Sequence, residues 1–173
     1  MTPQPTGLLA TTAAGRDLVL TRTFAAPIDD VWASITESER TARWFCSWEG
    51  EAGPGKVIRY RLEHEEGTPS GDMTVVACDP PRHLAVSVVD DYGSWRLDAD
   101  LAEADGVTVL TFTHHLDADA DPGSVGPGWE YYLDLLVASR TGGPQPSFDD
   151  YYPAMQAYYE QQAAQATPRP PSA

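Results

Sequence analysis

The 173-residue sequence lacks long hydrophobic runs, because its purely apolar stretches are only a few residues long. A helix that crosses a membrane needs about 20 apolar residues in succession, so we expect no membrane span. The first residues, 1–14, also lack the basic stretch and the apolar stretch that make up a secretion signal. We therefore expect a cytoplasmic protein that does not associate with a membrane.

Basic residues are also scarce. Lysine and arginine together number 11, against 26 aspartates and glutamates, which gives a net charge of −15. A field of this sign repels phosphate backbones and anionic lipid surfaces, so we expect no nucleic-acid partner. The acidic surface could serve solubility alone, or it could dock a basic face of a protein partner.

Cysteine is limited to Cys46 and Cys78, whose separation matches no metal-binding spacing. Without an export signal we expect both thiols to be reduced and buried, with a disulfide as the alternative. The chain has no nucleophile elbow, no P-loop, no glycine-rich dinucleotide fingerprint after a strand and no pair of CxxC motifs. We therefore expect no metal and no cofactor.

The clearest structural signal in the chain is an amphipathic helix over residues 128–140. Pro127 and Gly128 begin it, Arg140 lies in its last turn, and the Gly-Gly-Pro segment at 142–144 ends it. Its apolar side chains recur at helical spacing and form one stripe, which another part of the chain must cover. The stripe consists of Trp129, Tyr132, Leu133, Leu136 and Val137.

Most of the preceding chain alternates apolar and polar residues with period two, as half-buried strands do. Two short helices, over 28–35 and from about 38 to 44, follow the first strand. We therefore predict an α+β protein in which a curved antiparallel sheet of about seven strands wraps around the long C-terminal helix. The strands with a clear pattern are residues 16–24, 56–62, 71–78, 83–89, 94–101 and 107–116.

The domain boundaries follow from composition. We expect one domain over residues 16–165, and we expect 1–15 and 166–173 to be disordered because they are polar and contain proline. A tyrosine-rich stretch at 148–165 is expected to form a further helical segment. Its part at 148–159 could cover the mouth of a cavity or form a homodimer contact, so the chain could be a monomer or a homodimer.

Several short motifs occur in an order typical of one superfamily. They are FAAPIDDVW at 24–32, SGDM at 70–73, DPPRHL at 79–84, TFTH at 111–114 and GPGW at 126–129. Over about residues 16–140 the chain resembles the START-like superfamily (SRPBCC, Bet v 1-like, helix-grip), and within it the branch named for the C-terminal domain of the Hsp90 ATPase activator. The resemblance implies a seven-stranded sheet that curls around the long helix and encloses a hydrophobic cavity. Lipid carriers, plant hormone receptors, polyketide cyclases and co-chaperone domains share this fold, so fold alone does not decide the function.

The residues that would line such a cavity are those on the inward face of each strand, where every second side chain points, and those on the apolar stripe of the long helix. Ligand cavities are mostly apolar with a few placed polar groups, so we predict that a small apolar or aromatic molecule binds between the sheet and the helix. The alternative is that these side chains simply fill the core. Tyr60, Trp95, His114 and Tyr132 are the candidate polar contacts. The predicted ligand-binding residues are Tyr60, Trp95, Leu97, Phe112, His114, Trp129, Tyr132, Leu133 and Leu136.

Two other functions stay open at this stage. A protein-interaction module resembling the co-chaperone domain would dock a chaperone or another protein through its acidic surface. A cyclase-like or hydrolase-like enzyme would use His114, a weak catalytic candidate, for proton transfer. His114 and His115 point to opposite faces of one strand, so they cannot bind one metal ion together.

Two polar features fit the pattern poorly. Arg22 shares the apolar face of its strand, so it should lie at the exposed sheet edge, or else be buried and paired with a carboxylate or a ligand anion. The stretch 64–66 (His-Glu-Glu) lies next to a Gly/Pro turn and is expected to form a solvated hairpin tip.

Overall fold

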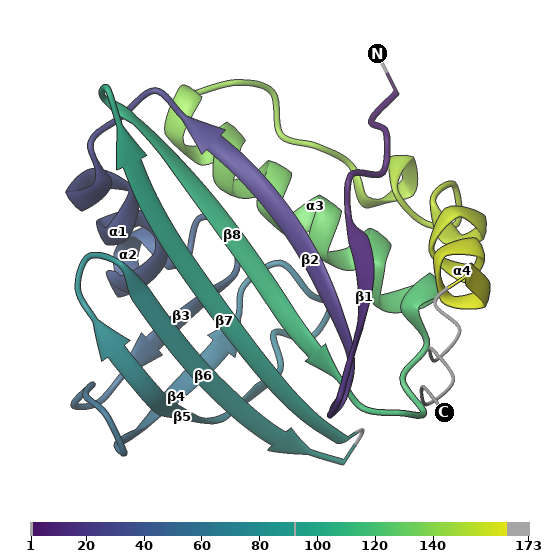
Figure 1. Ribbon diagram of the computed structural model, residues 1–173. Coiled ribbons are helices and arrows are strands. Elements are labelled where there is room, and N and C mark those ends of the chain that lie inside the picture. The colour runs from purple at the N-terminus through teal and green to yellow at the C-terminus, as the bar shows by residue number, and fades with distance from the viewer. Residues whose placement is uncertain (1, 92, 166–173) are drawn as a thin grey trace.

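The computed structural model describes residues 2–91 and 93–165. These residues form one eight-stranded antiparallel sheet with the order β1-β2-β8-β7-β6-β5-β4-β3. Figure 1 shows α1, α2 and α3 on one side of the curved sheet and α4 beside the β1 edge. The α+β helix-grip prediction is confirmed.

The strands are β1 Leu8–Thr12, β2 Gly15–Phe24, β3 Cys46–Glu49, β4 Val57–Leu62, β5 Ser70–Asp79, β6 His83–Asp90, β7 Gly93–Ala104 and β8 Val107–Leu116. The helices are α1 Ile28–Thr36, α2 Ser38–Thr41, α3 Pro122–Thr141, the 3-10 helix η1 Phe148–Asp150, and α4 Gln156–Gln165.

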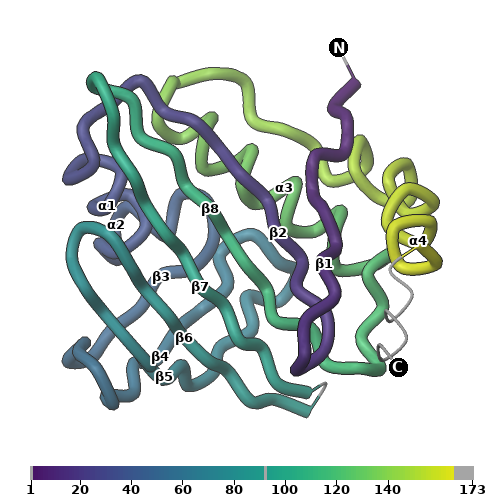
Figure 2. Tube along the Cα trace, in the orientation of Figure 1, coloured from purple at the N-terminus to yellow at the C-terminus, as the bar shows by residue number. Residues whose placement is uncertain are grey.

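The N-terminal segment differs from the prediction. Residues 8–12, expected within a disordered tail over 1–15, form strand β1 and pair with β2. The Leu-Leu-Ala-Thr-Thr sequence has no clear alternation, so its order comes from contacts with distant parts of the chain. Figure 2 shows β1 next to α4, which lies near the other end of the chain. The predicted C-terminal tail at 166–173 lies outside the described residues.

Side chains from the helices cover both edges of the sheet. At the β1 edge, the Leu9 N–H donates to Oε1 of Gln162 in α4 (3.5 Å). At the β3 edge, the Ser38 hydroxyl donates to the Trp48 carbonyl (2.7 Å) and accepts from the Trp48 N–H (2.8 Å). These contacts occupy some of the backbone groups with which an edge strand would pair with another chain.

The long helix begins earlier than the sequence predicts. α3 starts at Pro122 instead of residue 128, because the Asp121 side chain caps it by accepting from the Gly123 N–H (3.0 Å). Proline is tolerated at the first helical position, so Pro122 fits this start. Pro127 lies inside the helix and cannot donate the usual backbone hydrogen bond. The Gly- and Pro-rich sequence of the first two turns therefore indicated a loop, whereas tertiary contacts hold it helical.

The apolar core of the described residues consists of two clusters. The larger one joins α1, β2, β7, β8, α3 and the C-terminal segment, and it includes Leu18, Leu133 and Leu136 at 0% exposure. The smaller one consists of Ile58, Met73 and Val88 on β4, β5 and β6. The two clusters face each other across the concave side of the sheet. No helix among the described residues is long and apolar enough to cross a membrane.

Candidate ligand-binding cavity

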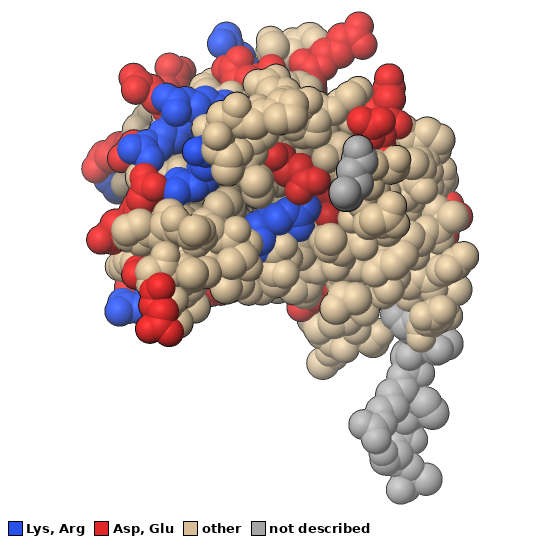
Figure 3. Space-filling model, turned by 90° about the horizontal axis from the view of Figure 1, so that it is seen from above, with Lys and Arg blue, Asp and Glu red and all other residues tan. Residues whose placement is uncertain are grey.

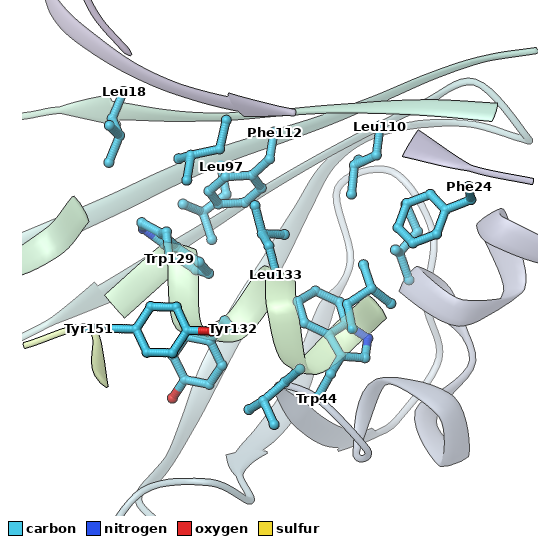
Figure 4. Close-up of a cluster of buried hydrophobic side chains, with 14 of the residues drawn as sticks. Leu18, Phe24, Trp44, Leu97, Leu110, Phe112, Trp129, Tyr132, Leu133 and Tyr151 are labelled. Carbon is cyan, nitrogen blue, oxygen red and sulfur yellow. The ribbon is translucent and has the colours of Figure 1, made fainter. Parts of the chain in front are cut away.

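A cavity of about 330 Å³ lies between α3 and the concave face of the sheet. It separates the smaller apolar cluster from part of the larger one, since residues of both clusters line it. In Figure 4 the sheet residues Leu97 and Phe112 lie opposite Trp129 and Leu133 of α3. The lining residues are Ile35, Thr36, Thr41, Trp44, Phe45, Cys46, Trp48, Ala52, Gly53, Ile58, Met73, Val75, Cys78, Leu84, Val86, Leu97, Asp98, Ala99, Leu110, Phe112, Trp129 and Leu133.

Three tryptophans in the cavity wall are fixed by hydrogen bonds to the protein itself. The Trp44 indole N–H donates to the Ser34 carbonyl at 2.9 Å. The Trp48 indole N–H donates to the Thr36 carbonyl at 3.0 Å, which is one of the last carbonyls of α1. The third, Trp129, donates from Nε1 to a histidine on β8, described below. All three indole donors are therefore occupied, and the tryptophans contribute carbon surface to the cavity.

The aromatic side chains of the wall form a connected cluster. The Phe112 and Trp129 rings lie 4.4 Å apart between centroids, and Phe45 lies 5.6 Å from both Trp129 and Trp44. Phe45 packs against both apolar clusters, so it bridges them at one end of the cavity. Tilted ring pairs at these separations add about 0.5–1.5 kcal/mol each beyond their buried area. These contacts pack the aromatic rings of this part of the wall against one another.

The cavity holds almost no charge. Among the described residues that line it, Asp98 alone is acidic, and its Oδ2 lies 3.3 Å from the His115 ring on the opposite, convex face of the sheet. Burial raises the pKa of the Cys46 thiol to about 12, so this thiol stays protonated at neutral pH. Cys78 reaches the concave face because a β-bulge between Val75 and Ala77 shifts the parity of β5. Both cysteines are free thiols.

The structure separates the nine predicted ligand-binding residues into two groups. Four of them, Leu97, Phe112, Trp129 and Leu133, line the cavity, and their contact with a ligand stays a prediction. The other five lie elsewhere. Leu136 is fully buried in the larger cluster, Tyr60 packs against the smaller cluster, and Trp95 packs against both. The Tyr132 hydroxyl donates to Glu65 (2.7 Å), and His114 lies behind Trp129.

The contact between Tyr132 and Glu65 also revises the view of the hairpin after β4. Glu65 itself is exposed, as expected for a hairpin tip, but its carboxylate binds a tyrosine of α3. His64 is half-buried and its Nε2 lies 3.0 Å from the Ala42 carbonyl. The hairpin therefore rests against both α3 and the segment after α2 and is not simply solvated.

His114 is poorly placed for proton transfer to a bound molecule. Its ring is buried, stacks on Trp95 at 5.0 Å, and uses Nδ1 to accept the Trp129 indole N–H at 3.0 Å. Burial, with a smaller contribution from the neighbouring His115, lowers the pKa of His114 to about 4. The imidazole is therefore neutral at pH 7 and serves to hold Trp129 in the cavity wall.

Arg22 is half-buried and points toward α3, and it is not exposed at the sheet edge. Its guanidinium lies 2.8 Å from Glu130 and 2.9 Å from Asp134, both on α3. The second of the two expectations, an inward arginine paired with protein carboxylates, describes the structure. Arg22 is consequently not available for an anionic ligand.

Among the described residues no group of three or more His, Cys, Asp or Glu side chains is placed to hold a metal ion.

The aromatic wall contributed by residues 44–48 was missed at the sequence level. The second short helix, α2, ends at Thr41 and not at residue 44 as predicted. The run Trp-Phe-Cys-Ser-Trp follows two residues later, and Trp44, Phe45, Cys46 and Trp48 all line the cavity. Three aromatic residues within five positions are a detectable signal. The strand β3 begins only at Cys46 and has four residues, too few to display a period, so the run gave no indication of which face it presents.

The curved sheet, the long helix laid across it and the apolar cavity between them define a START-like domain of the helix-grip type. The sequence model of the family described as "Activator of Hsp90 ATPase homolog 1-like protein" matches residues 25–139. The chain belongs to this family. A comparison with proteins of curated function finds no match.

Solved structures with this fold include proteins from several bacteria. CalU16 from Micromonospora echinospora has a TM-score of 0.73 at 25% identity, over 94% of this chain and 98% of CalU16. EF2215 from Enterococcus faecalis, a conserved protein of unknown function, has a TM-score of 0.73 at 17% identity, over 93% and 92% of the two chains. DynU16 has a TM-score of 0.63 at 20% identity, over 76% of this chain and 50% of DynU16.

Proposed function

We propose that this protein binds a small, uncharged, apolar or aromatic molecule in the cavity between α3 and the sheet. The observation that carries the proposal is the cavity itself, about 330 Å³ in volume and lined mostly by aliphatic and aromatic side chains. Ligand cavities run from about 300 to 1,000 Å³. An engineered apolar cavity of about 150 Å³ holds one benzene molecule, so the present cavity suits roughly two fused rings.

The chemistry of the wall favours a neutral ligand. A charged group that entered would lose its hydration and find no charged partner among the lining residues that the structure describes, because the Asp98 carboxylate binds His115 on the other face. The indole donors of Trp44, Trp48 and Trp129 are also occupied. Affinity would therefore come mainly from apolar burial and ring contacts.

A matched pair of ligands tests this proposal. 2-Naphthol and 2-naphthoate share the same fused rings, but only the second carries a charge at pH 7. In isothermal titration calorimetry we expect 2-naphthol to bind at least tenfold more tightly than 2-naphthoate, because the carboxylate must be desolvated. No measurable binding of 2-naphthol, or equal affinities for the two compounds, would contradict the proposal.

A matched pair of variants locates the site. Ala99 lines the cavity on β7, whereas Ala102 on the same strand points to the exposed convex face. Ala99→Phe places a ring in the cavity and should weaken 2-naphthol binding at least tenfold. Ala102→Phe adds the same ring outside and should leave the affinity within twofold of the wild type. Unchanged binding in Ala99→Phe would place the ligand elsewhere.

Native mass spectrometry of the purified protein would identify a natural ligand directly. A small-molecule mass that is lost on denaturation would support a carrier or receptor role. DynU16 is described as a protein of the dynemicin biosynthetic locus. By analogy, products of such biosynthetic loci belong among the compounds screened.

The family description, which names an activator of the Hsp90 ATPase, supports a second candidate function as a protein-interaction module. On the face shown in Figure 3, Lys and Arg side chains lie among Asp and Glu side chains, so this face presents no continuous acidic patch. Affinity for a basic partner that falls steeply with salt would favour the second candidate, whereas binding in the apolar cavity should be nearly independent of salt.

We also propose a cytoplasmic location, since both cysteines are free thiols.

A further inference from the structure

Glu130 is a buried carboxylate on the side of α3 that faces away from the cavity. Its side chain is 1% exposed and pairs with Arg22 of β2 at 2.8 Å. It also accepts hydrogen bonds from the Thr6 hydroxyl (2.9 Å), the Gly7 N–H (2.9 Å) and the Tyr159 hydroxyl. One carboxylate of the long helix thus binds the N-terminal segment and the C-terminal helix at the same time.

The two terminal segments also bind each other around Tyr159. The Gly7 N–H lies 3.1 Å from the Tyr159 hydroxyl, and the Gly7 carbonyl accepts from the Tyr158 hydroxyl at 2.9 Å. A Cβ atom at either Gly7 or Gly126 would lie 2.5 Å from an atom of Tyr159, so only glycine allows this approach. We call residues 6–12 together with α4 the terminal clasp. Figures 1 and 2 show its two parts side by side against α3.

Neighbouring residues of α3 face the cavity on one side of the helix and the terminal clasp with Arg22 on the other. Trp129 and Leu133 form part of the cavity wall, whereas Glu130 and Asp134 bind Arg22, and Asp134 also accepts from Tyr151 (2.8 Å). A helix moves as a unit, so a shift on the clasp side displaces the cavity wall as well. The Trp129 indole, bonded to His114 of β8, would report such a shift.

We propose that the terminal clasp sets the position of α3 against the sheet and thereby the shape of the cavity, with Glu130 as the positioning residue. The clasp segments lie outside residues 25–139, the region that the family model matches. The coupling is reciprocal, because a ligand that favours the closed position of α3 must favour the closed clasp by the same factor. This ligand-dependent part rests on the proposed function, whereas the positioning of α3 does not.

Two variants open the clasp without touching the cavity. Gly126→Ala adds a methyl group 2.5 Å from the Tyr159 ring, so α4 must move away. Tyr159→Phe keeps the ring and removes only the hydroxyl that donates to Glu130, which makes it the milder variant if the first fails to fold. Asp72→Asn is the control, since Asp72 of β5 pairs with Arg59 of β4 (3.3 Å), far from β1 in the sheet and outside the cavity lining.

The first measurement needs no ligand. In ¹⁵N-labelled protein we expect Gly126→Ala to shift the indole N–H signal of Trp129 and to speed its exchange with solvent at least tenfold, together with that of the Gly7 amide. Tyr159→Phe should shift both signals in the same direction by less, and Asp72→Asn should move neither. Faster exchange at Gly7 with an unchanged Trp129 signal would overturn the proposal, because the clasp would then only anchor the termini. An unchanged Gly7 amide in Gly126→Ala would overturn it too.

The second measurement tests the coupling with 2-naphthol. We expect the compound to slow exchange of the Gly7 amide in the wild type and to bind Gly126→Ala about fivefold more weakly. Equal affinity in both, with the clasp shown to be open, would overturn the coupling. If the wild type does not bind 2-naphthol, the proposed function fails, and the Trp129 signal still decides whether the clasp positions α3.

Discussion

Replacing Arg22 by methionine tests the buried ion pair that joins β2 to α3. Methionine keeps the aliphatic stem but removes the guanidinium, which leaves Glu130 charged, 1% exposed and without its cation. Breaking a buried pair on one side costs about 3–5 kcal/mol, because the remaining charge is uncompensated. For a chain of 173 residues this corresponds to a fall in Tm of roughly 6–20 °C.

The same variant should change the response to acid. Burial by itself raises the pKa of Glu130, but hydrogen bonds from Tyr159, Arg22 and other donors outweigh it and hold the pKa below the ordinary 4.5. A carboxyl group with a lowered pKa contributes stability above pH 4.5, and this contribution is lost as the pH falls through the folded-state value. Without Arg22 the pKa of Glu130 rises, so the difference between variant and wild type should shrink between pH 7 and pH 4.

Urea unfolding at several pH values measures both effects. The double variant Arg22→Met/Glu130→Gln serves as the control, since removing both charges should restore part of the lost free energy of unfolding. A free energy of unfolding for Arg22→Met within 1 kcal/mol of the wild type at pH 7 would refute the reasoning. A cost that does not shrink in acid would show that packing, not charge, explains the loss.

Two further predictions concern the convex face and the thiols. Burial lowers the pKa of His115, but hydrogen bonds to Asp17 and Asp98 outweigh this and raise it above 6.5. The resulting stability is fully present below pH 6.5 and is lost as the pH rises through the folded-state value, so His115→Gln should flatten the dependence of Tm on pH above 6.5. Half-buried Cys78 should react with a maleimide faster than buried Cys46, and bound 2-naphthol should slow that reaction. Equal rates at the two thiols, seen by mass spectrometry, would contradict the assigned burial.

Much of the architecture follows from local patterns in the sequence. The apolar stripe of α3 and the period-two segments are dictated by helix and strand geometry, so they predicted a sheet wrapped around one helix. Parity also placed Leu97 and Phe112 on the concave face, where the structure has them. These features depend on spacing within a few residues, which a single sequence displays directly.

Tertiary structure decided which of the inward residues reach the cavity. Trp129 and Tyr132 belong to one stripe, yet Trp129 lines the cavity while Tyr132 binds Glu65 of a hairpin distant in sequence. The spacing of apolar residues predicts which face of a helix is buried. It does not predict which strand or hairpin packs against each residue of that face. Likewise, the bulge in β5 turned Cys78 to the concave side, which strict alternation could not indicate.

The sequence by itself determined the fold class, the order of the main elements and the apolar faces, because these depend on residues close together along the chain. Only the tertiary structure decided that residues 8–12 form a strand, that Arg22 pairs with carboxylates of α3, and that Glu130 joins both ends of the chain. The partners of Glu130 are 108 to 124 positions away toward the N-terminus and 29 toward the C-terminus. Contacts of that range arise from how the sheet and helices pack, which no local pattern specifies.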